Sequence, residues 1–173
     1  MELLGSFTFV AIDGAEVRLK SGSSRLMNVE IKAPVRSGSL HIVDSIATMN
    51  LVLALDKLKT GNFLTEVAAR TFISGYKAQD LVFNGSGPRN ANSDGSADGS
   101  ADGSAYDVLG NAVAGEIDVQ MSIVLTSVGN SAQPEVELTG SAQFGTVHIP
   151  LPGIGTVENM NIEIDARLAI RQS

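Results

Sequence analysis

Two pairs of carboxylates in this chain have a spacing that could support acid–base chemistry. Glu116 and Asp118 lie two residues apart, as do Glu163 and Asp165, so the members of each pair share one face of an extended strand. Two carboxylates in a sheltered environment could divide the roles of acid and base. Both pairs alternate with strong apolar rows, so they face water if those rows face the interior. We therefore interpret both pairs as solvated surface residues.

Two histidines and three aspartates are the other residues whose chemistry needs an interpretation. His41 and His148 stand in strand-like segments with no Cys, Asp or Glu at a metal-ligand spacing, and we expect structural or solvent-facing roles for both. Asp94, Asp98 and Asp102 each begin a DGSA repeat. A calcium loop needs carboxylates at alternate positions and a distal Glu, and these aspartates, four residues apart, match neither requirement. Residues 90–105 are therefore predicted to be a flexible, solvated insertion, with calcium binding as the alternative.

The chain carries no sequence motif of an enzyme class. It contains no GxSxG elbow, GxGxxG loop, P-loop or HExxH helix, and it has no cysteine. We therefore expect a protein that is not an enzyme and that holds neither a metal ion nor a cofactor.

Length and net charge restrict the number of domains and the kinds of binding partner. The 173 residues fit one domain, which we expect to span 1–173. The formal net charge of −7 disfavours nucleic acid, which requires a basic face, and it disfavours electrostatic attachment to anionic lipid. No apolar run approaches the ~20 residues of a transmembrane helix. Residues 1–10 do not resemble a signal peptide, so we expect a cytoplasmic location, or a periplasmic or secreted one if a signal has been removed.

Most of the chain is patterned for β-structure. Apolar residues alternate with polar ones, and one wet and one dry face is typical of an antiparallel sheet. Several such runs separated by turn signals predict an all-β fold: an antiparallel barrel of about eight strands, or a sandwich. The rows that we expect to face its interior are Met49, Leu51 and Leu53; Ile117, Val119 and Met121; and Ile162 and Ile164.

One segment, residues 62–74, predicts a helix instead. Its apolar side chains recur at intervals of three to five, which suits a helix face. Asn62 can cap the first turn, and Gly75 can end the helix in a left-handed conformation. Arg70 shares the apolar side of a regular helix, so its guanidinium must find a carboxylate or carbonyl, or reach solvent. The side chains that we expect to bring the helix onto the sheet are Phe63, Leu64, Phe72 and Ile73.

The residues around this helix resemble the YceI-like family. Residues 58–62, Leu-Lys-Thr-Gly-Asn, are similar to the family's Leu-x-Thr-Gly-Asn element, and Arg70 falls where the family's helix carries an arginine. Tyr76 and the strand at 81–83 resemble the tyrosine and strand that follow. Further similarity lies in residues 37–40, 138–141, 149–152 and 157–170. The chain departs from the family at 66–69, which replace an Asp-His, at Lys77, which replaces a proline, at 121–124, which replace His-Gly-Val-Thr, and near 13–17, which lack a His-Ser.

The resemblance implies a lipocalin-like barrel that binds or transports an isoprenoid lipid, either a polyisoprenoid or an isoprenoid quinone, without catalysis. In this hypothesis the apolar rows converge on a cavity, and Asn62 and Arg70 have structural roles at the junction of helix and barrel. The residues expected to contact the lipid are Met49, Leu51, Leu53, Phe63, Leu64, Phe72, Ile73, Tyr76, Phe83, Ile117, Val119, Met121, Ile162 and Ile164.

A second hypothesis stays open beside the lipid carrier. A small barrel can be filled by its own side chains, and the chain would then be a structural or protein-interaction β-domain. Val52 and Ala54, next to Leu51 and Leu53, are the nearest case of a strand that is apolar on both faces. A homodimer is a further arrangement that we consider.

Overall fold

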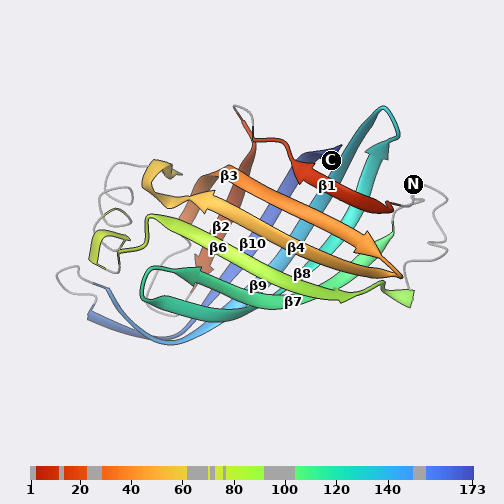
Figure 1. Ribbon diagram of the computed structural model, residues 1–173. Helices are drawn as coiled ribbons and strands as arrows, with labels where there is room; N and C mark the ends of the chain where they lie inside the picture. The colour runs from red at the N-terminus through yellow and green to blue at the C-terminus, as the bar shows by residue number, and fades with distance from the viewer. Residues whose placement is uncertain are drawn as a thin grey trace.

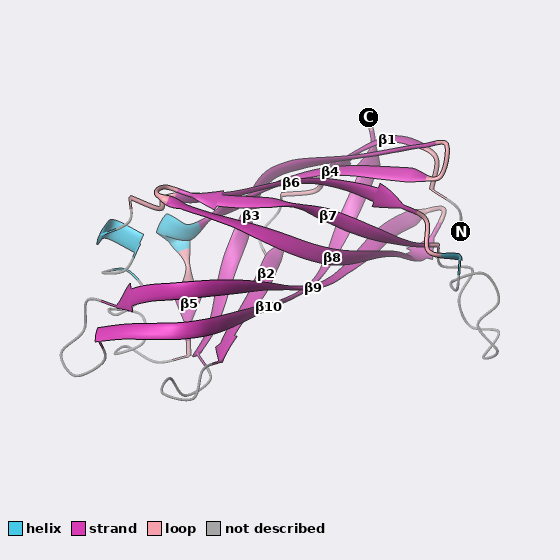
Figure 2. Cartoon of the chain, turned by 90° about the horizontal axis from the view of Figure 1, so that it is seen from below, coloured by secondary structure: helices cyan, strands magenta, loops and turns pink. Residues whose placement is uncertain are grey.

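The computed structural model describes residues 3–11, 14–22, 29–61, 70, 73–75, 77–91, 104–149 and 155–173, with the side chains of 21–22, 29, 144–149 and 155–160 excepted. Long strands wrap around a common interior in Figure 1, and Figure 2 shows the same arrangement from below. The elements are β1 (Gly5–Phe9), β2 (Glu16–Gly22), β3 (Val29–Val43), β4 (Ile46–Ala54), the 3-10 helix η1 (Leu55–Lys57), β5 (Lys59–Thr60), β6 (Asp80–Pro88), β7 (Ala105–Ala114), β8 (Ile117–Asn130), β9 (Gln133–Ile149) and β10 (Gly155–Gln172).

The strands form a closed antiparallel ring. The hydrogen-bonded order β10-β2-β3-β4-β6-β7-β8-β9 returns to β10 through the β9–β10 pairing, which gives eight positions. β1 shares one position with β2, because β2 pairs with β3 at residues 29–34 and β1 pairs with it at residues 39–42. Closure removes the unpaired edges that an open sheet would expose. The predicted all-β, lipocalin-like barrel of about eight strands is confirmed.

Side-chain alternation separates the inside of this ring from the outside. In β4, Ala47, Met49 and Leu51 are buried. Ile46, which precedes them, and Thr48, which lies between Ala47 and Met49, are exposed. Successive strand residues point to opposite faces, so every strand except the two-residue β5 contributes apolar side chains to a single core cluster. Removal of this surface from water stabilises the barrel by about 25 cal/mol per Å² of apolar area.

A β-bulge makes β3 change partners halfway along its length. The register with β4 shifts between Val35 and Ser37, which leaves Arg36 as the extra residue. Residues 29–34 of β3 pair with β2 and residues 31–32 with β5, whereas residues 39–42 pair with β1 and the β4 pairing runs from Val35 across the bulge to Val43. Arg36 donates hydrogen bonds to Asp56 Oδ1 (2.8 Å) and to Asp80 Oδ1 (2.9 Å). The bulge therefore ties β3 to η1 and to the start of β6.

The predicted helix is present in the described residues Arg70 and 73–75, but its predicted end is wrong. Gly75 is helical and its φ is not positive; the left-handed residue is Lys77, with φ +56°. Ala78 N–H donates to the Ile73 carbonyl (2.8 Å) and Lys77 N–H to the Ser74 carbonyl (3.2 Å). These two bonds form a Schellman motif. A lysine occupies the position that glycine favours, so residue type alone misplaced the end.

The ends of the predicted insertion belong to the barrel wall. Asn90 N–H donates to the Ala105 carbonyl (2.7 Å), and Ser127 N–H donates to the Ser104 carbonyl (3.0 Å). Ser104 N–H in turn donates to Ser127 Oγ (3.0 Å), and both serines are buried. The predicted insertion, 90–105, therefore extends too far, because its last two residues make hydrogen bonds with the strands of the sheet. Residues 92–103 lie outside the described part of the chain.

Candidate ligand-binding site

The apolar rows predicted from the sequence face the interior of the barrel. The core cluster contains Met49, Leu51, Leu53, Phe83, Met121 and Ile164. Val119, Ile162 and Ile73 are partly buried against it, and Ile117 is also partly buried. The rows therefore converge as predicted, while their contact with a lipid stays a prediction. The remaining predicted residues, which lie outside the described part, are Asn62, Phe63, Leu64, Phe72 and Tyr76.

Burial is uneven along the barrel. Near the end that holds the β3–β4 turn, the inward side chains of Leu40 and Val136 are at most 1% exposed. A pocket of about 440 Å³ opens to solvent at that end, lined by Leu3, Leu4, Phe7, Ser131, Ala132, Pro134, Ile170, Arg171 and Gln172. At the opposite end, beside η1, five inward apolar side chains of the described strands are only partly buried: Ile31, Leu81, Ile117, Val119 and Ile162. An inward side chain that keeps accessible area borders space that a water molecule can enter. We call this end the mouth and define it by these five residues.

Two buried phenylalanine rings, Phe9 and Phe83, lie against glycines inside the barrel. Gly38 and Gly85 occupy inward positions, and a Cβ at either would lie 2.7 Å from the Phe9 ring or 2.6 Å from the Phe83 ring. Each ring therefore rests directly on glycine backbone, where a side chain would displace it. Phe83 shares the inward face of β6 with Leu81, so its ring forms a floor below the mouth.

Polar contacts hold the wall beside the mouth in place. Asp56 N–H donates to the Gln79 carbonyl (3.1 Å), which joins η1 to the approach of β6. Arg36 adds its bonds to Asp56 and Asp80. Arg70 Nη1 donates to the Asp56 carbonyl oxygen at 3.3 Å, and the side chain is exposed, so two of the predicted alternatives, a carbonyl partner and access to solvent, occur together. Such exposed pairs contribute only about 0–1 kcal/mol each, and they position the helix rather than stabilise the barrel.

Several apolar residues at the mouth end were not among the predicted site residues. Leu55, Leu58 and Ala78 are buried there, and Ile31 and Leu81 border the mouth. The signal for Ile31 was its alternation with Ala33, and that for Leu81 was its place in the strand resembling the family. Leu55 lies in a 3-10 helix and Ala78 lies in the Schellman motif, and neither a period of two nor one of 3.6 applies at either place.

The carboxylates and the histidine that could take part in acid–base chemistry lie on the outside of the barrel. Glu116, Asp118, Glu163 and Asp165 are all exposed, as expected for solvated surface residues. His41 is exposed, with Nδ1 2.7 Å from Ser6 Oγ, while the side chain of His148 is not described. Among the described residues no cluster of three His, Cys, Asp or Glu side chains could hold a metal ion. Nor is any described helix long and apolar enough to cross a membrane.

Fold and interior together define a lipocalin-like barrel with an apolar mouth. The chain is similar in structure to a polyisoprenoid binding domain from Saccharophagus degradans implicated in plant cell wall breakdown, with a TM-score of 0.60, 12% identity, and coverage of 96% of this chain and 98% of that chain. It is also similar to Burkholderia cenocepacia BcnA, with a TM-score of 0.52, 12% identity, and coverage of 90% and 96%. No protein-family model and no curated protein matches the chain. The likeness shows a shared fold, and it is the fold that the YceI-like resemblance implies.

Proposed function

We propose that the chain binds an isoprenoid lipid, a polyisoprenoid or an isoprenoid quinone, inside its barrel and carries it without catalysis. The observation that carries the proposal is the mouth, where inward apolar side chains keep accessible area, whereas Leu40 and Val136 near the other end are buried. Two further findings support it: the YceI-like resemblance of the sequence, and the similarity in fold to a domain described as polyisoprenoid binding. A periplasmic location rests on the resemblance alone, and fractionation of producing cells tests it.

An aliphatic lining of this kind suits an isoprenoid chain. Ile31, Leu81, Val119 and Ile162 offer neither charge nor hydrogen bonds, so they recognise a ligand by burial alone. Each buried methylene contributes about 0.8 kcal/mol, so one five-carbon unit contributes roughly 4 kcal/mol before the cost of ordering the chain. Two buried units supply roughly 8 kcal/mol before that cost, so a micromolar complex, which needs a net ~8 kcal/mol, requires more than two buried units. No catalytic group is needed for such binding.

Native mass spectrometry of the purified protein tests the proposal. We expect a retained lipid that organic extraction removes, and we expect the extracted protein to regain the mass of an added polyisoprenoid alcohol or isoprenoid quinone. A linear saturated alcohol of equal carbon number is the matched control for selectivity. A protein that retains no lipid and takes up neither isoprenoid would contradict the proposal.

A second candidate function, protein interaction, is favoured by the outer face of β4, β6 and β7. Val52, Val82 and Val113 are direct cross-strand neighbours there and point away from the interior. Val113 and Leu109 are 40% and 52% exposed. An uncharged apolar patch suits a protein partner or a second copy of the chain. Light scattering on the wild type and on Leu109→Lys tests the homodimer, which requires a dimeric wild type that the substitution dissociates.

A further inference from the structure

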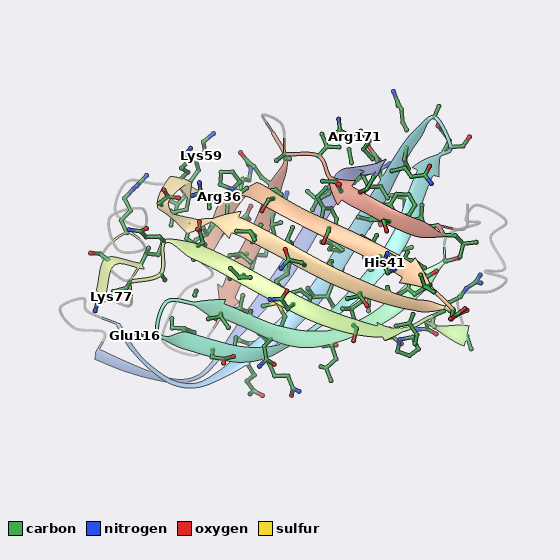
Figure 3. The ribbon with its side chains drawn as sticks, in the orientation of Figure 1. Arg36, His41, Lys59, Lys77, Glu116 and Arg171 are labelled. Atoms are coloured by element: carbon green, nitrogen blue, oxygen red, sulfur yellow. The ribbon has the colours of Figure 1, made fainter. Side chains whose placement is uncertain are left out.

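The inward face of β6 passes from an accessible side chain to bare backbone over a short stretch. β6 runs from the mouth toward the end that holds the β3–β4 turn, and Figure 3 shows Glu116 at the first of these ends and His41 at the second. Its successive inward positions are Leu81, which is partly buried, Phe83, which is 1% exposed, and Gly85. On this wall the limit of the accessible interior therefore falls at Phe83.

The ring of Phe83 occupies space that residue 85 leaves empty. Gly85 is the cross-strand partner of Gly110 in β7, so two adjacent inward positions carry no side chain. A Cβ at Gly85 would lie 2.6 Å from Cζ and 3.0 Å from Cε1 of the Phe83 ring. The ring therefore leans from residue 83 toward Gly85, away from the mouth. Because protein interiors leave few voids, we interpret the ring as the group that fills the space in front of the glycine pair.

The side chains around the ring could not replace it as a barrier. Phe83 pairs with Ala112, and Ala112 pairs with Val119, which borders the mouth. Ala112 offers only a methyl group. Met49 and Met121 are the outer cross-strand partners of the glycine pair, and methionine side chains are flexible and adapt to the space around them. Loss of the ring would therefore join the space in front of the glycine pair to the mouth.

We propose that Phe83 sets the length of isoprenoid that the barrel buries, because the leading end of the chain stops against its ring. The inference rests on the proposed function and adds a specificity to it. An isoprenoid that enters through the mouth buries one five-carbon unit after another until it reaches the ring. Each further unit stays in water and adds nothing to the affinity, since only surface removed from water does so. Affinity should therefore rise with chain length to a plateau, and Phe83 determines the length at which the plateau begins.

A change of residue 83 should move this plateau. Phe83→Ala removes about six carbon atoms, which is close to the size of one five-carbon unit. The variant should therefore bury one unit more, and its affinity for the first isoprenoid beyond the wild-type plateau should rise at least about tenfold. Phe83→Leu removes about three carbon atoms and keeps more of the core filled, so it should give a smaller gain with the same isoprenoid.

Native mass spectrometry titrations with isoprenoid alcohols that differ by one five-carbon unit measure the plateau. Phe83→Ala should lower the melting temperature by roughly 6–20 °C, so each variant is titrated at a temperature where circular dichroism shows it to be folded. Phe9→Ala is the matched control. Phe9 is 2% exposed and its ring rests on Gly38, but it pairs with Ile170, eight residues along β10 from Ile162 at the mouth. The control should lose similar stability and keep the wild-type plateau.

Three outcomes overturn the proposal: a wild-type affinity that rises without a plateau, a plateau that neither substitution of Phe83 moves, or a shift in Phe9→Ala as large as that in Phe83→Ala. Each of these leaves the proposed function intact, because the wild type still binds isoprenoids. A wild type that binds no isoprenoid of any length would instead refute the proposed function, and the role of Phe83 with it. If Phe83→Ala does not fold, the plateau of Phe83→Leu decides.

Discussion

The same substitution at two levels of the barrel distinguishes an accessible mouth from a filled core. Val119 faces the mouth and is partly buried, whereas Val136 is fully buried near the opposite end. A phenylalanine forced into a packed interior costs about 1–3 kcal/mol, which for a chain of this size lowers the melting temperature by roughly 2–12 °C. Val136→Phe should show this fall. Val119→Phe should change the melting temperature by less than about 2 °C, because its larger side chain can occupy the accessible space.

The ligand measurement must accompany the thermal one on the same samples. Val119→Phe should lose most of its isoprenoid binding because the phenylalanine ring fills the entrance. Val136→Phe should keep its isoprenoid binding at temperatures where the variant is folded. Circular dichroism melts and native mass spectrometry provide the two measurements. If Val119→Phe is destabilised as strongly as Val136→Phe, the mouth is packed, and the barrel is filled by its own side chains.

Three further predictions concern the helix and the insertion. Arg70→Ala should lower stability by at most about 1 kcal/mol, since its bond to the Asp56 carbonyl is exposed to solvent; unchanged stability together with unchanged ligand retention would mean that Arg70 is only a solvated charge. Lys77→Gly should raise the melting temperature by about 2–4 °C, because glycine adopts φ +56° without the cost that lysine bears; Lys77→Ala is the control and should not raise it. Replacement of residues 92–103 by a short Gly-Ser linker should change stability by about 1 kcal/mol or less, and a fall of many degrees would show that this segment packs.

The sequence predicted the inward and outward faces well, because alternation follows from strand geometry alone. Met49, Leu51 and Leu53 must share a face whatever the fold, and the structure buries all three. The position of a residue along the barrel axis, near the mouth or near the other end, cannot be predicted in this way. Val119 and Val136 both alternate with polar neighbours, yet one borders the mouth and the other is sealed. That difference depends on which strands pair and where each ends, and no local pattern contains it.

Cross-strand relations escaped sequence reasoning for the same reason. Arg18, Lys32 and Lys59 are far apart in the chain and become neighbours only through the registers of β2, β3 and β5. The bulge at Arg36 is also invisible locally, since an arginine within an alternating run gives no sign of an extra residue. The helix end failed differently: a glycine was available, but the Schellman hydrogen bonds formed two residues later, around Lys77.

Photo-cross-linking locates the ligand most directly. An isoprenoid alcohol that carries a diazirine at the far end of its chain is added to the extracted protein, irradiated, and mapped by peptide sequencing. We expect cross-links on inward residues of the mouth and its floor, above all Leu81, Phe83, Val119 and Ile162, and competition by unlabelled isoprenoid. Cross-links confined to the outer face of the strands, or insensitive to competitor, would contradict binding inside the barrel.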